Sequence, residues 1–561
     1  MASVEITSIQ EIRKVSSAST WDRPWVAYAL ATGIYLVASG LTRPIFLSDT
    51  MYYLTTASPG VSGFWDFGHL LWRPFLWLLL RHVDGAPPDR LLHVFHMVDF
   101  LSTLAGLAAV WFTVATLRLF THRVVATTLS ATLLSFSHVV QTYSKGGCAY
   151  IFAFLFLSIA FYTLIDAAIT EPPSWIGAVI SGVSLCLAVC LWFPYILALA
   201  GTLLAPVFLL EHPRRPWRLV FSVGLISAVL GFMAYGAVAS HLGIRSLKDF
   251  IAWAETSSHG ITISGAKRAV FGLARSFISL GENDAYAVTV KRFVLHDPYN
   301  PVHIFRSLGP PLWKLVLFYS FLGSILVSLP RATCGNRMFL LLLTTAFPVL
   351  GFAILWQGAD LERYLPLFPA LMLAIGLSLS TLPYRSATSA IVGLFLVTLV
   401  ITNSFSLSIN LRQRQLQQLS ATVHSLNEVL PAESLVLLPP MHPLQRIYWD
   451  FPEALPLAEK HLQLERLVDL NTHDTPTWRQ RVCRKIAQSW NKQIPVVMES
   501  SLLQRSPAPD SAWVEGDDPR VRWKDISGFT SKLEVGDRVG DSDFFWIPAT
   551  SANVESLSNC R

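Results

Sequence analysis

Between Trp25 and Ile409 the chain contains about eleven apolar runs, each long enough to cross a lipid bilayer as a helix. A helix needs roughly 20 apolar residues to span the hydrocarbon core, where every backbone polar group must be hydrogen-bonded within the protein. The expected spans are residues 25–41, 94–119, 124–140, 148–168, 175–193, 194–210, 219–241, 312–329, 338–356, 365–382 and 388–409. This pattern predicts an all-α polytopic membrane bundle of about 11 transmembrane helices.

The overall composition excludes an ordinary soluble protein. Of the 561 residues, 52% are hydrophobic and only 14% are charged, and the mean hydropathy is +0.45. The 43 basic residues outnumber the 37 acidic ones, but they are scattered between the apolar runs. Orienting loops and contacts with the headgroups of membrane lipids explain them better than a nucleic-acid partner does.

The distribution of arginine and lysine predicts the orientation, because short loops rich in these residues remain cytoplasmic. They occur before the first span and in the loops near 118–123, 214–218, 331–337 and 385. The N-terminal segment 1–24 carries charges and no apolar core, so a cleaved signal is not expected and the segment is placed in the cytoplasm. The loops 42–93, 242–311 and 357–364 and the chain from residue 410 are then placed outside.

A soluble domain is expected over residues 410–561, where no further run is long enough to span. Ser434–Leu438 and Pro495–Met498 are predicted as strands, and Leu457–Leu467 and Trp478–Trp490 as helices, which together predict a small extracytoplasmic α/β domain. It contains no glycine-rich phosphate loop. Cys483 and Cys560 could form a disulfide there if the domain faces an oxidising compartment.

The loop 42–93 carries the polar residues that most suggest chemistry, because carboxylates and histidine are costly to dehydrate beside a bilayer. Asp49 follows the first span, and Asp66 and His69 lie among the aromatic residues of 64–69. The stretch His69–His82 is too short to span and is expected to form an interfacial or re-entrant helix. Asp49 could act as a general base, or it could instead cap a helix that begins near Thr50.

Asp66 and His69 have two open interpretations. They could orient an acceptor or ligate a divalent metal, since carboxylate and imidazole are both metal ligands. The alternative is that they are polar neighbours of an interfacial aromatic anchor.

Two segments resemble the GT-C superfamily of integral-membrane glycosyltransferases, which includes protein O-mannosyltransferases and the aminoarabinose transferases of lipid A. The segment Asp49-Thr50-Met51-Tyr52-Tyr53, followed by Gly68-His69 and Arg73-Pro74, resembles the first outer loop of these enzymes. The segment Asp360–Pro369 is similar to the proline-containing Arg-Tyr segment that opens a late span in them, and Arg363 and Tyr364 supply that pair.

The resemblance implies a polyprenyl-phosphate or dolichyl-phosphate monosaccharide as the donor and a lipid, glycan or protein as the acceptor. The reaction would occur at the outer face of the membrane, with a bacterial inner (plasma) membrane as the expected location. Asp49 would accept the proton of the attacking hydroxyl or amine, and a single displacement would invert the anomeric carbon. No organic cofactor is expected, and a divalent metal is left open.

The departing phosphate would require a nearby guanidinium or ammonium group. Arg363 is the first candidate, although a local ion pair with Glu362 at the membrane interface would also explain it. Further candidates for the phosphate are Arg73, Lys145, Lys267 and Arg268. Tyr52, Glu362, Tyr364 and His259 are further candidate site residues that could contact the acceptor. The amphipathic stretches 247–254 and 267–277 are expected to lie in the interface and frame the entrance for a lipid.

The alternatives from other classes are a transporter or lipid flippase and a non-catalytic membrane assembly subunit. Transporters concentrate ionisable residues near the middle of the bilayer. Here only Asp99 lies within a predicted span among the polar residues of interest, which favours the enzyme.

Overall fold

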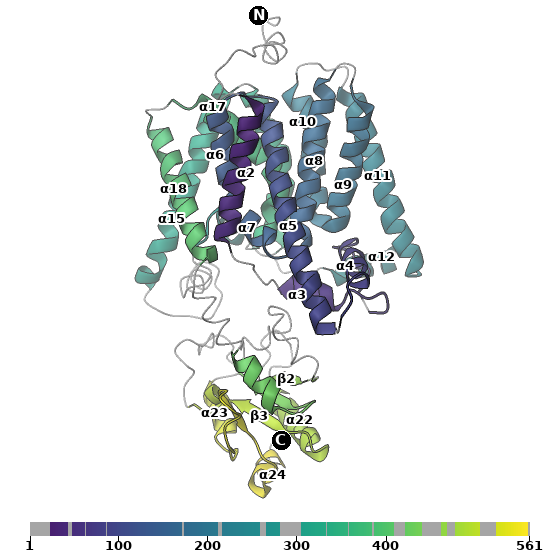
Figure 1. Cartoon of the computed structure of the whole chain (residues 1–561), viewed down its shortest axis with the longest axis vertical. Coiled ribbons are helices and arrows are strands. Elements are labelled where there is room, and N and C mark those ends of the chain that lie inside the picture. The colour runs from purple at the N-terminus through teal and green to yellow at the C-terminus, as the bar shows by residue number, and fades with distance from the viewer. Residues whose placement is uncertain are drawn as a thin grey trace, which may run out of the picture.

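The computed structural model describes residues 23–42, 48–61, 63–85, 87–170, 173–210, 216–257, 265–280, 304–332, 334–356, 358, 360–383, 386–408, 421–439, 460, 462–467, 477–504 and 523–558. A bundle of long helices is followed by a small domain built around a sheet (Figure 1). The predicted architecture, an all-α polytopic bundle with a C-terminal α/β domain, is confirmed.

The bundle is made almost entirely of helices. They are α2 (Pro24–Leu41), α3 (Ser48–Thr55), α4 (Trp72–Arg81), α5 (Pro87–Arg118), α6 (Val124–Ser135), α7 (His138–Ser144), α8 (Ala149–Ile169), α9 (Trp175–Leu191), η2 (Phe193–Ala198), α10 (Leu199–Leu209), α11 (Pro216–His241), α12 (Leu247–Thr256), α13 (Ala266–Phe277), α15 (Ile304–Ser328), η3 (Leu329–Arg331), α16 (Gly335–Leu355), η4 (Leu361–Leu367), α17 (Phe368–Thr381) and α18 (Ala387–Ser408).

Within the described residues, eight helices are long and apolar enough to cross a membrane, or nine if one bent pair is counted as a span. The bent pair is α6 and α7, which replaces the single helix predicted over 124–140 and turns by 60°. The predicted spans 175–193 and 194–210 appear as the shorter apolar helices Trp175–Leu191 and Phe193–Leu209. A helix of 17 residues is only about 25 Å long. The total of eleven spans therefore stays a prediction.

The break between α6 and α7 leaves backbone groups without helical partners. The side chain of Asn403 on α18 forms hydrogen bonds with some of these groups. Its side-chain amide donates to the carbonyls of Phe136 (2.6 Å) and Phe277 (2.7 Å), and its oxygen accepts from the amide of Ser279 (2.8 Å). Unpaired backbone groups are costly inside a membrane protein. One buried asparagine thus stabilises both the break and the end of α13.

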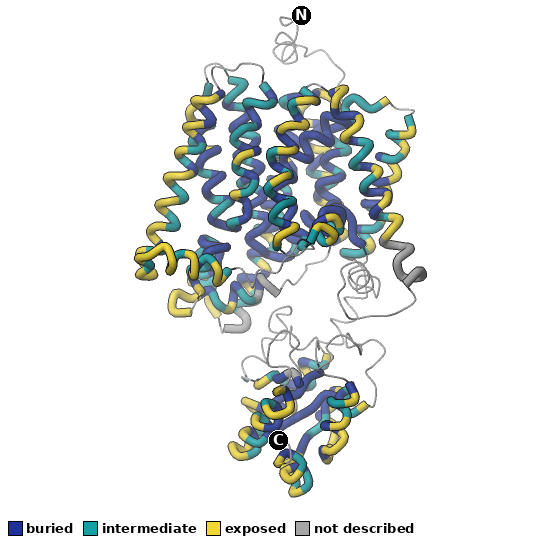
Figure 2. Tube along the Cα trace, turned by 180° about the vertical axis from the view of Figure 1, so that it is seen from behind, coloured by how far each residue is buried: buried dark blue, intermediate teal, exposed yellow. Residues whose placement is uncertain are grey.

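The outer faces of the peripheral helices expose apolar side chains, whereas the interior of the bundle is buried (Figure 2). Phe232 of α11 is 81% exposed and Phe347 of α16 is 82% exposed. An exposed apolar surface of this extent marks contact with a membrane. The chain is therefore an integral, multi-pass membrane protein.

Helices α3, α4 and α12 lie at one end of the bundle, opposite to the end at which α2 begins (Figure 1). Helix α5 extends beyond its neighbours at this end, and the C-terminal domain lies on the same side. Both α4 and α12 are short and amphipathic, as predicted for interfacial helices.

The C-terminal domain contains a four-stranded sheet in the order β2-β1-β3-β4. The strands are β1 (Leu435–Leu438), β2 (Gln463–Arg466), β3 (Val496–Glu499) and β4 (Phe544–Trp546), and β4 alone is antiparallel to its neighbour. The described residues of the domain also form a helix over 421–429, helices α22 (Trp478–Asn491), α23 (Trp523–Thr530) and α24 (Ser551–Ser558) and the short η7 (Ser500–Leu503).

The predicted strands 434–438 and 495–498 and the predicted helix 478–490 are confirmed, but the helix predicted over 457–467 is wrong for residues 463–466. Residues 463–466 form strand β2, which pairs in parallel with β1. The pairing with a neighbouring strand overrides the local pattern there. Cys483 is disulfide-bonded, and Cys560, the possible partner named from the sequence, lies outside the described residues.

Candidate functional site

The loop between α3 and α4 is organised around the carboxylate of Asp66. Oδ1 accepts hydrogen bonds from the amide of Gly68 (2.9 Å) and from the hydroxyl of Ser257. Oδ2 lies 3.3 Å from Nη1 of Arg73 and 3.5 Å from Nδ1 of His69. Only 3% of the Arg73 side chain and 11% of the Asp66 side chain are exposed, so this ion pair is largely withdrawn from water.

Arg73, at the start of α4, forms hydrogen bonds and ring contacts in addition to its ion pair with Asp66. Its Nε donates to Oγ1 of Thr56 (3.1 Å) and its Nη1 to the carbonyl of Gly63. The guanidinium also lies over the rings of Tyr52 (5.1 Å) and Tyr53 (4.8 Å). Arg73 is thereby occupied by protein partners, which suits a positioning role better than the predicted role in phosphate binding.

His69 is only 8% exposed and connects the loop to the bundle. Its Nδ1 lies 3.0 Å from the hydroxyl of Tyr53, and its ring lies 5.7 Å from the ring of Tyr150 on α8. Its Nε2 is buried and has no hydrogen-bond partner among the described residues. A buried polar atom without a partner is costly, and it is a common feature of functional sites.

Burial opposes the ionisation of Asp66, but hydrogen bonds from His69 and Ser257 and the charges of His69 and Arg73 outweigh it. Together they hold the pKa of Asp66 well below its usual range. A carboxylate that holds its proton so weakly is a poor general base at neutral pH. The geometry therefore favours Asp66 as the organiser of the loop.

Helix α12 fixes this loop from the other side. The indole of Trp253 donates to the carbonyl of Trp65 (2.9 Å), and Ser257, which follows the helix, contacts Asp66. The ring of Phe67 packs against Trp253 (5.1 Å) and Tyr235 of α11 (5.1 Å). The amphipathic helix predicted to frame the entrance thus holds the aromatic loop in place.

Asp66→Asn is expected to loosen the loop, because Arg73 would keep its charge in a buried position without an anionic partner. The expected loss of local stability is about 2–4 kcal/mol. Hydrogen exchange of the amides at 63–72 should accelerate in the variant, whereas Asp84→Asn, at an exposed carboxylate after α4, should leave it unchanged.

Since the pKa of Asp66 is lowered, its contribution to the stability of the loop is complete at neutral pH and is lost only as the pH falls below about 4. Unchanged exchange in Asp66→Asn would contradict this role.

Arg363 lies in η4, at the start of the α17 span, and is only 6% exposed. Its Nη2 is 3.6 Å from Oε1 of Glu362 and 3.7 Å from Oδ2 of Asp360. The guanidinium lies 3.9 Å from the ring centroid of Trp356 and 5.5 Å from that of Trp192. The local Glu–Arg pair considered as an alternative is present, and the aromatic rings leave the cation poorly hydrated.

Tyr364 positions this segment. Its hydroxyl lies 2.6 Å from the carbonyl of Gly358 and 2.8 Å from that of Ala269 on α13. It is buried and serves to dock η4 on α13.

Two tyrosines connect the first loop to η4. The ring of Tyr150 lies 5.7 Å from His69 and 4.8 Å from the ring of Tyr143 at the end of α7. The hydroxyl of Tyr143 in turn donates to Glu362, the neighbour of Arg363. The structure thus joins two polar segments that are far apart in the sequence, Asp66–Arg73 and Asp360–Tyr364.

The backbone of Asp49 belongs to α3, and its side chain lies outside the described residues. The next residue, Thr50, is fully buried, and its hydroxyl donates to the carbonyl of Gly146. Helix α3 is therefore docked on the turn after α7 that contains Lys145. The two roles predicted for Asp49, a general base and a helix cap, therefore both remain predictions.

The remaining predicted site residues differ in their exposure and in their contacts. Lys267 is exposed and Arg268 partly exposed, both in the first turn of α13, and neither forms an ion pair with a described residue. His259 lies outside the described residues. Tyr52 is half-buried and contacts Arg73.

The donor set at Asp66 and His69 does not fit a divalent metal. Among the described residues no three His, Cys, Asp or Glu side chains converge as a metal site. Oδ1 of Asp66 is occupied by two hydrogen bonds, and Oδ2 faces the Arg73 cation, which would repel a second positive charge.

Sequence reasoning missed the residues that connect the site. Four aromatic residues make these contacts: Tyr150 with His69, Tyr143 with Glu362, and Trp192 and Trp356 with Arg363. All four lie within or beside apolar runs. An aromatic residue in such a run gives no signal that separates a site residue from a lipid-facing or core residue.

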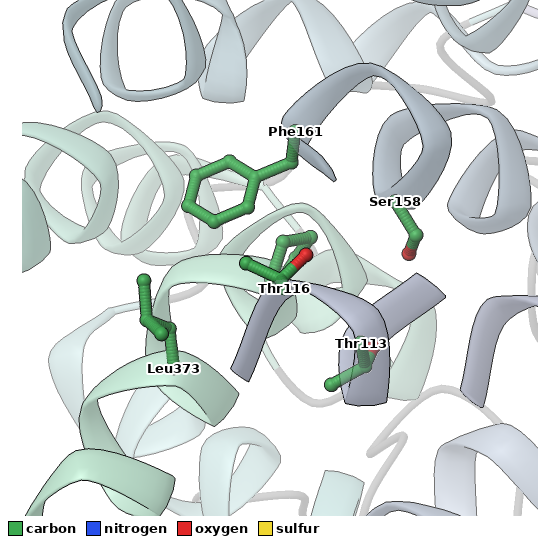
Figure 3. Close-up of a pocket in the computed structure, with 6 residues that line it drawn as sticks. Thr113, Thr116, Ser158, Phe161 and Leu373 are labelled. Atoms are coloured by element: carbon green, nitrogen blue, oxygen red, sulfur yellow. The ribbon is translucent and has the colours of Figure 1, made fainter. Parts of the chain in front are cut away.

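A gap inside the bundle lies between α5, α8 and α17, lined by Thr113, Thr116, Ser158, Phe161, Pro369 and Leu373 (Figure 3). It leaves no room for a water-sized molecule. None of its lining residues belongs to the cluster described above, so it is a packing gap.

No protein-family model and no curated protein sequence matches the chain. Among solved structures, the fold is similar to that of ArnT from Cupriavidus metallidurans in the apo state, with a TM-score of 0.52 and 12% identity over 95% of this chain and 98% of that chain. The same protein bound to undecaprenyl phosphate gives a TM-score of 0.51 and 11% identity over 95% of this chain and 99% of that chain.

A further similar structure is the archaeal oligosaccharyltransferase AglB from Archaeoglobus fulgidus in complex with an inhibitory peptide and a dolichol-phosphate. The TM-score is 0.49 and the identity 14%, over 96% of this chain and 78% of that chain. The likeness to ArnT extends over nearly the whole of both chains and shows that this chain shares the fold of ArnT.

Proposed function

We propose that this chain, which has the GT-C fold of ArnT, is a membrane glycosyltransferase that takes its sugar from a polyprenyl-phosphate or dolichyl-phosphate donor. The observation that carries the proposal is the junction of the Asp66–Arg73 loop with Glu362 and Arg363 through Tyr150 and Tyr143. This junction gathers charged groups at one end of a membrane bundle, where the headgroup of a lipid could reach them. ArnT, which shares the fold, has been captured with undecaprenyl phosphate.

In the proposed reaction the acceptor hydroxyl or amine attacks the anomeric carbon while Asp49 takes its proton. The bond from that carbon to the phosphate oxygen breaks, and the lipid phosphate leaves with the bonding electron pair. Arg363 would stabilise the negative charge of the leaving group by charge-assisted hydrogen bonds. A single displacement of this kind inverts the anomeric centre.

Arg363 must give up an ion-pair partner to bind a phosphate. Its present contacts indicate that this exchange costs little free energy. Both carboxylates lie more than 3.5 Å from Nη2, and Asp360 is 40% exposed. The long ion pair with the partly exposed Asp360 contributes little to stability, so Arg363 can give it up while it keeps the pair with the buried Glu362. The aromatic rings around the guanidinium would exclude water and strengthen its attraction to a phosphate.

The purified protein is expected to bind undecaprenyl phosphate more tightly than undecaprenol, which has the same chain and no phosphate. The affinity of both lipids can be followed by quenching of the fluorescence of the indoles near Arg363, or by native mass spectrometry. Equal affinity for the two lipids would contradict a donor site built around phosphate. Release of lipid phosphate from a sugar-linked form then tests transfer itself.

For the orientation we propose a cytoplasmic N-terminus and an extracytoplasmic site and C-terminal domain, in a bacterial inner membrane. The loop helices and the C-terminal domain lie at the same end of the bundle, which supports a common side (Figure 1). A cysteine introduced at Ser551, in the exposed first turn of α24, should react with an impermeant thiol reagent in cells whose inner membrane is intact. Reaction only after that membrane is permeabilised would overturn this orientation.

A further inference from the structure

Asp99 lies within the candidate membrane span of α5, and no role has been assigned to it so far. It is half-buried, about 18 Å along the helix from Pro87. Its Oδ1 is buried and has no hydrogen-bond partner among the described residues. A carboxylate in this position destabilises the protein unless another group compensates it, so its presence indicates a ligand or a partner.

Close packing places Asp99 beside the helix that carries Asp49. Gly147, in the turn between α7 and α8, has a φ of 63°, and a Cβ built on it would lie 3.1 Å from Cγ2 of Thr50 and 3.7 Å from the amide nitrogen of Asp99. The hydroxyl of Thr103 lies 3.1 Å from the carbonyls of both Asp99 and Ser144. The α5 backbone, the turn and α3 are therefore in contact at this point.

Lys145 lies in the same turn and supplies the opposite charge. Lys145 directly follows Ser144, whose carbonyl shares the hydroxyl of Thr103 with the carbonyl of Asp99. Among the described residues the side chains of Lys145 and Asp99 form no direct ion pair, and that of Lys145 makes no hydrogen bond. Lys145 also follows Tyr143, the residue bonded to Glu362, by two positions. A carboxylate and an ammonium group thus extend from neighbouring backbone segments, beside the helix that carries Asp49.

We propose that this separated pair binds the two halves of the donor headgroup: Asp99 binds the sugar and Lys145 binds the phosphate. A carboxylate accepts hydrogen bonds from sugar hydroxyls or from a sugar ammonium group, and an ammonium donates to phosphate oxygens. Asp99 is then a residue that positions the sugar beside Asp49. This assignment rests on the proposed glycosyltransferase function and adds a contact that distinguishes one headgroup from another.

The test compares Asp99→Asn and Lys145→Met with the wild-type protein, using undecaprenyl phosphate and its glucose-, mannose- and aminoarabinose-linked forms as probes. In Asp99→Asn the affinity for the preferred sugar-linked lipid should fall by about ten-fold, while the affinity for bare undecaprenyl phosphate is unchanged. In Lys145→Met the affinity for both should fall. Asp166→Asn, at the far end of α8, removes a carboxylate away from the site and should change neither.

Thermal unfolding gives a second reading that does not depend on ligand. Removing a half-buried carboxylate whose Oδ1 has no hydrogen-bond partner among the described residues should leave the Tm of the free protein unchanged or raise it. A Tm that falls by several degrees, failure of Asp99→Asn to fold, or equal losses of affinity for bare and sugar-linked lipid would each overturn the assignment and make Asp99 structural.

The wild-type protein provides a further test. If it binds bare undecaprenyl phosphate as tightly as it binds each of the three sugar-linked forms, the assignment is also overturned. If the wild-type protein binds none of the lipids, the proposed function fails, and this assignment fails with it.

Discussion

Asp49→Asn is expected to slow sugar transfer by a factor on the order of 100 to 10,000, the range typical for loss of a general base. Asparagine caps a helix about as well as aspartate, so α3 should remain docked through Thr50 and its bond to Gly146. What the variant loses is the group that accepts the proton. The rate of transfer from a polyprenyl-phosphate sugar, measured with purified protein, checks this expectation.

Two controls separate catalysis from folding in this experiment. Binding of undecaprenyl phosphate by Asp49→Asn should equal that of the wild-type protein, because in the proposed reaction Asp49 acts on the acceptor and Arg363 on the phosphate. Asp84→Asn removes an exposed carboxylate at the same end of the bundle and should transfer at the wild-type rate. Full activity of Asp49→Asn would make Asp49 a helix cap, and the base would have to be sought elsewhere.

Arg363→Lys is expected to weaken donor binding by about ten-fold or more, which is the second large effect. Lysine keeps the charge but cannot stack flat on Trp356 or offer two parallel N–H donors to a phosphate. The dissociation constant of undecaprenyl phosphate measures this loss.

Arg81→Lys is a matched control, because Arg81 also lies over an indole, that of Trp77, at 5.7 Å, and is exposed at the end of α4. That variant should bind the lipid as the wild-type protein does. If Arg363→Lys binds the lipid normally and only lowers the Tm, Arg363 is a structural partner of Glu362 and Asp360, and Lys145 becomes the main candidate for the phosphate.

The candidate site was predictable in its parts and not in its connections. Asp66, His69 and Arg363 were identifiable because charged residues beside apolar runs are rare and costly. The roles of Asp66 and Arg73 were not predictable, since they depend on Ser257, Thr56 and Gly63, which lie elsewhere in the chain. Asp99 was visible as the carboxylate within a span, but its relation to Lys145 depends on the packing of α5 against the turn after α7.

The sequence by itself determined that the chain is a helical membrane bundle with a soluble C-terminal domain, because twenty apolar residues in a row have few other structures available to them. It also determined the short amphipathic helices α4, α12 and α13, whose periodic charges are local features. Only the tertiary structure decided that 463–466 is a strand, that 124–144 bends by 60°, and that Tyr150 and Tyr143 join the first loop to Arg363. Each of these depends on a partner distant in the sequence, and a local pattern of apolar and polar residues contains no information about that partner.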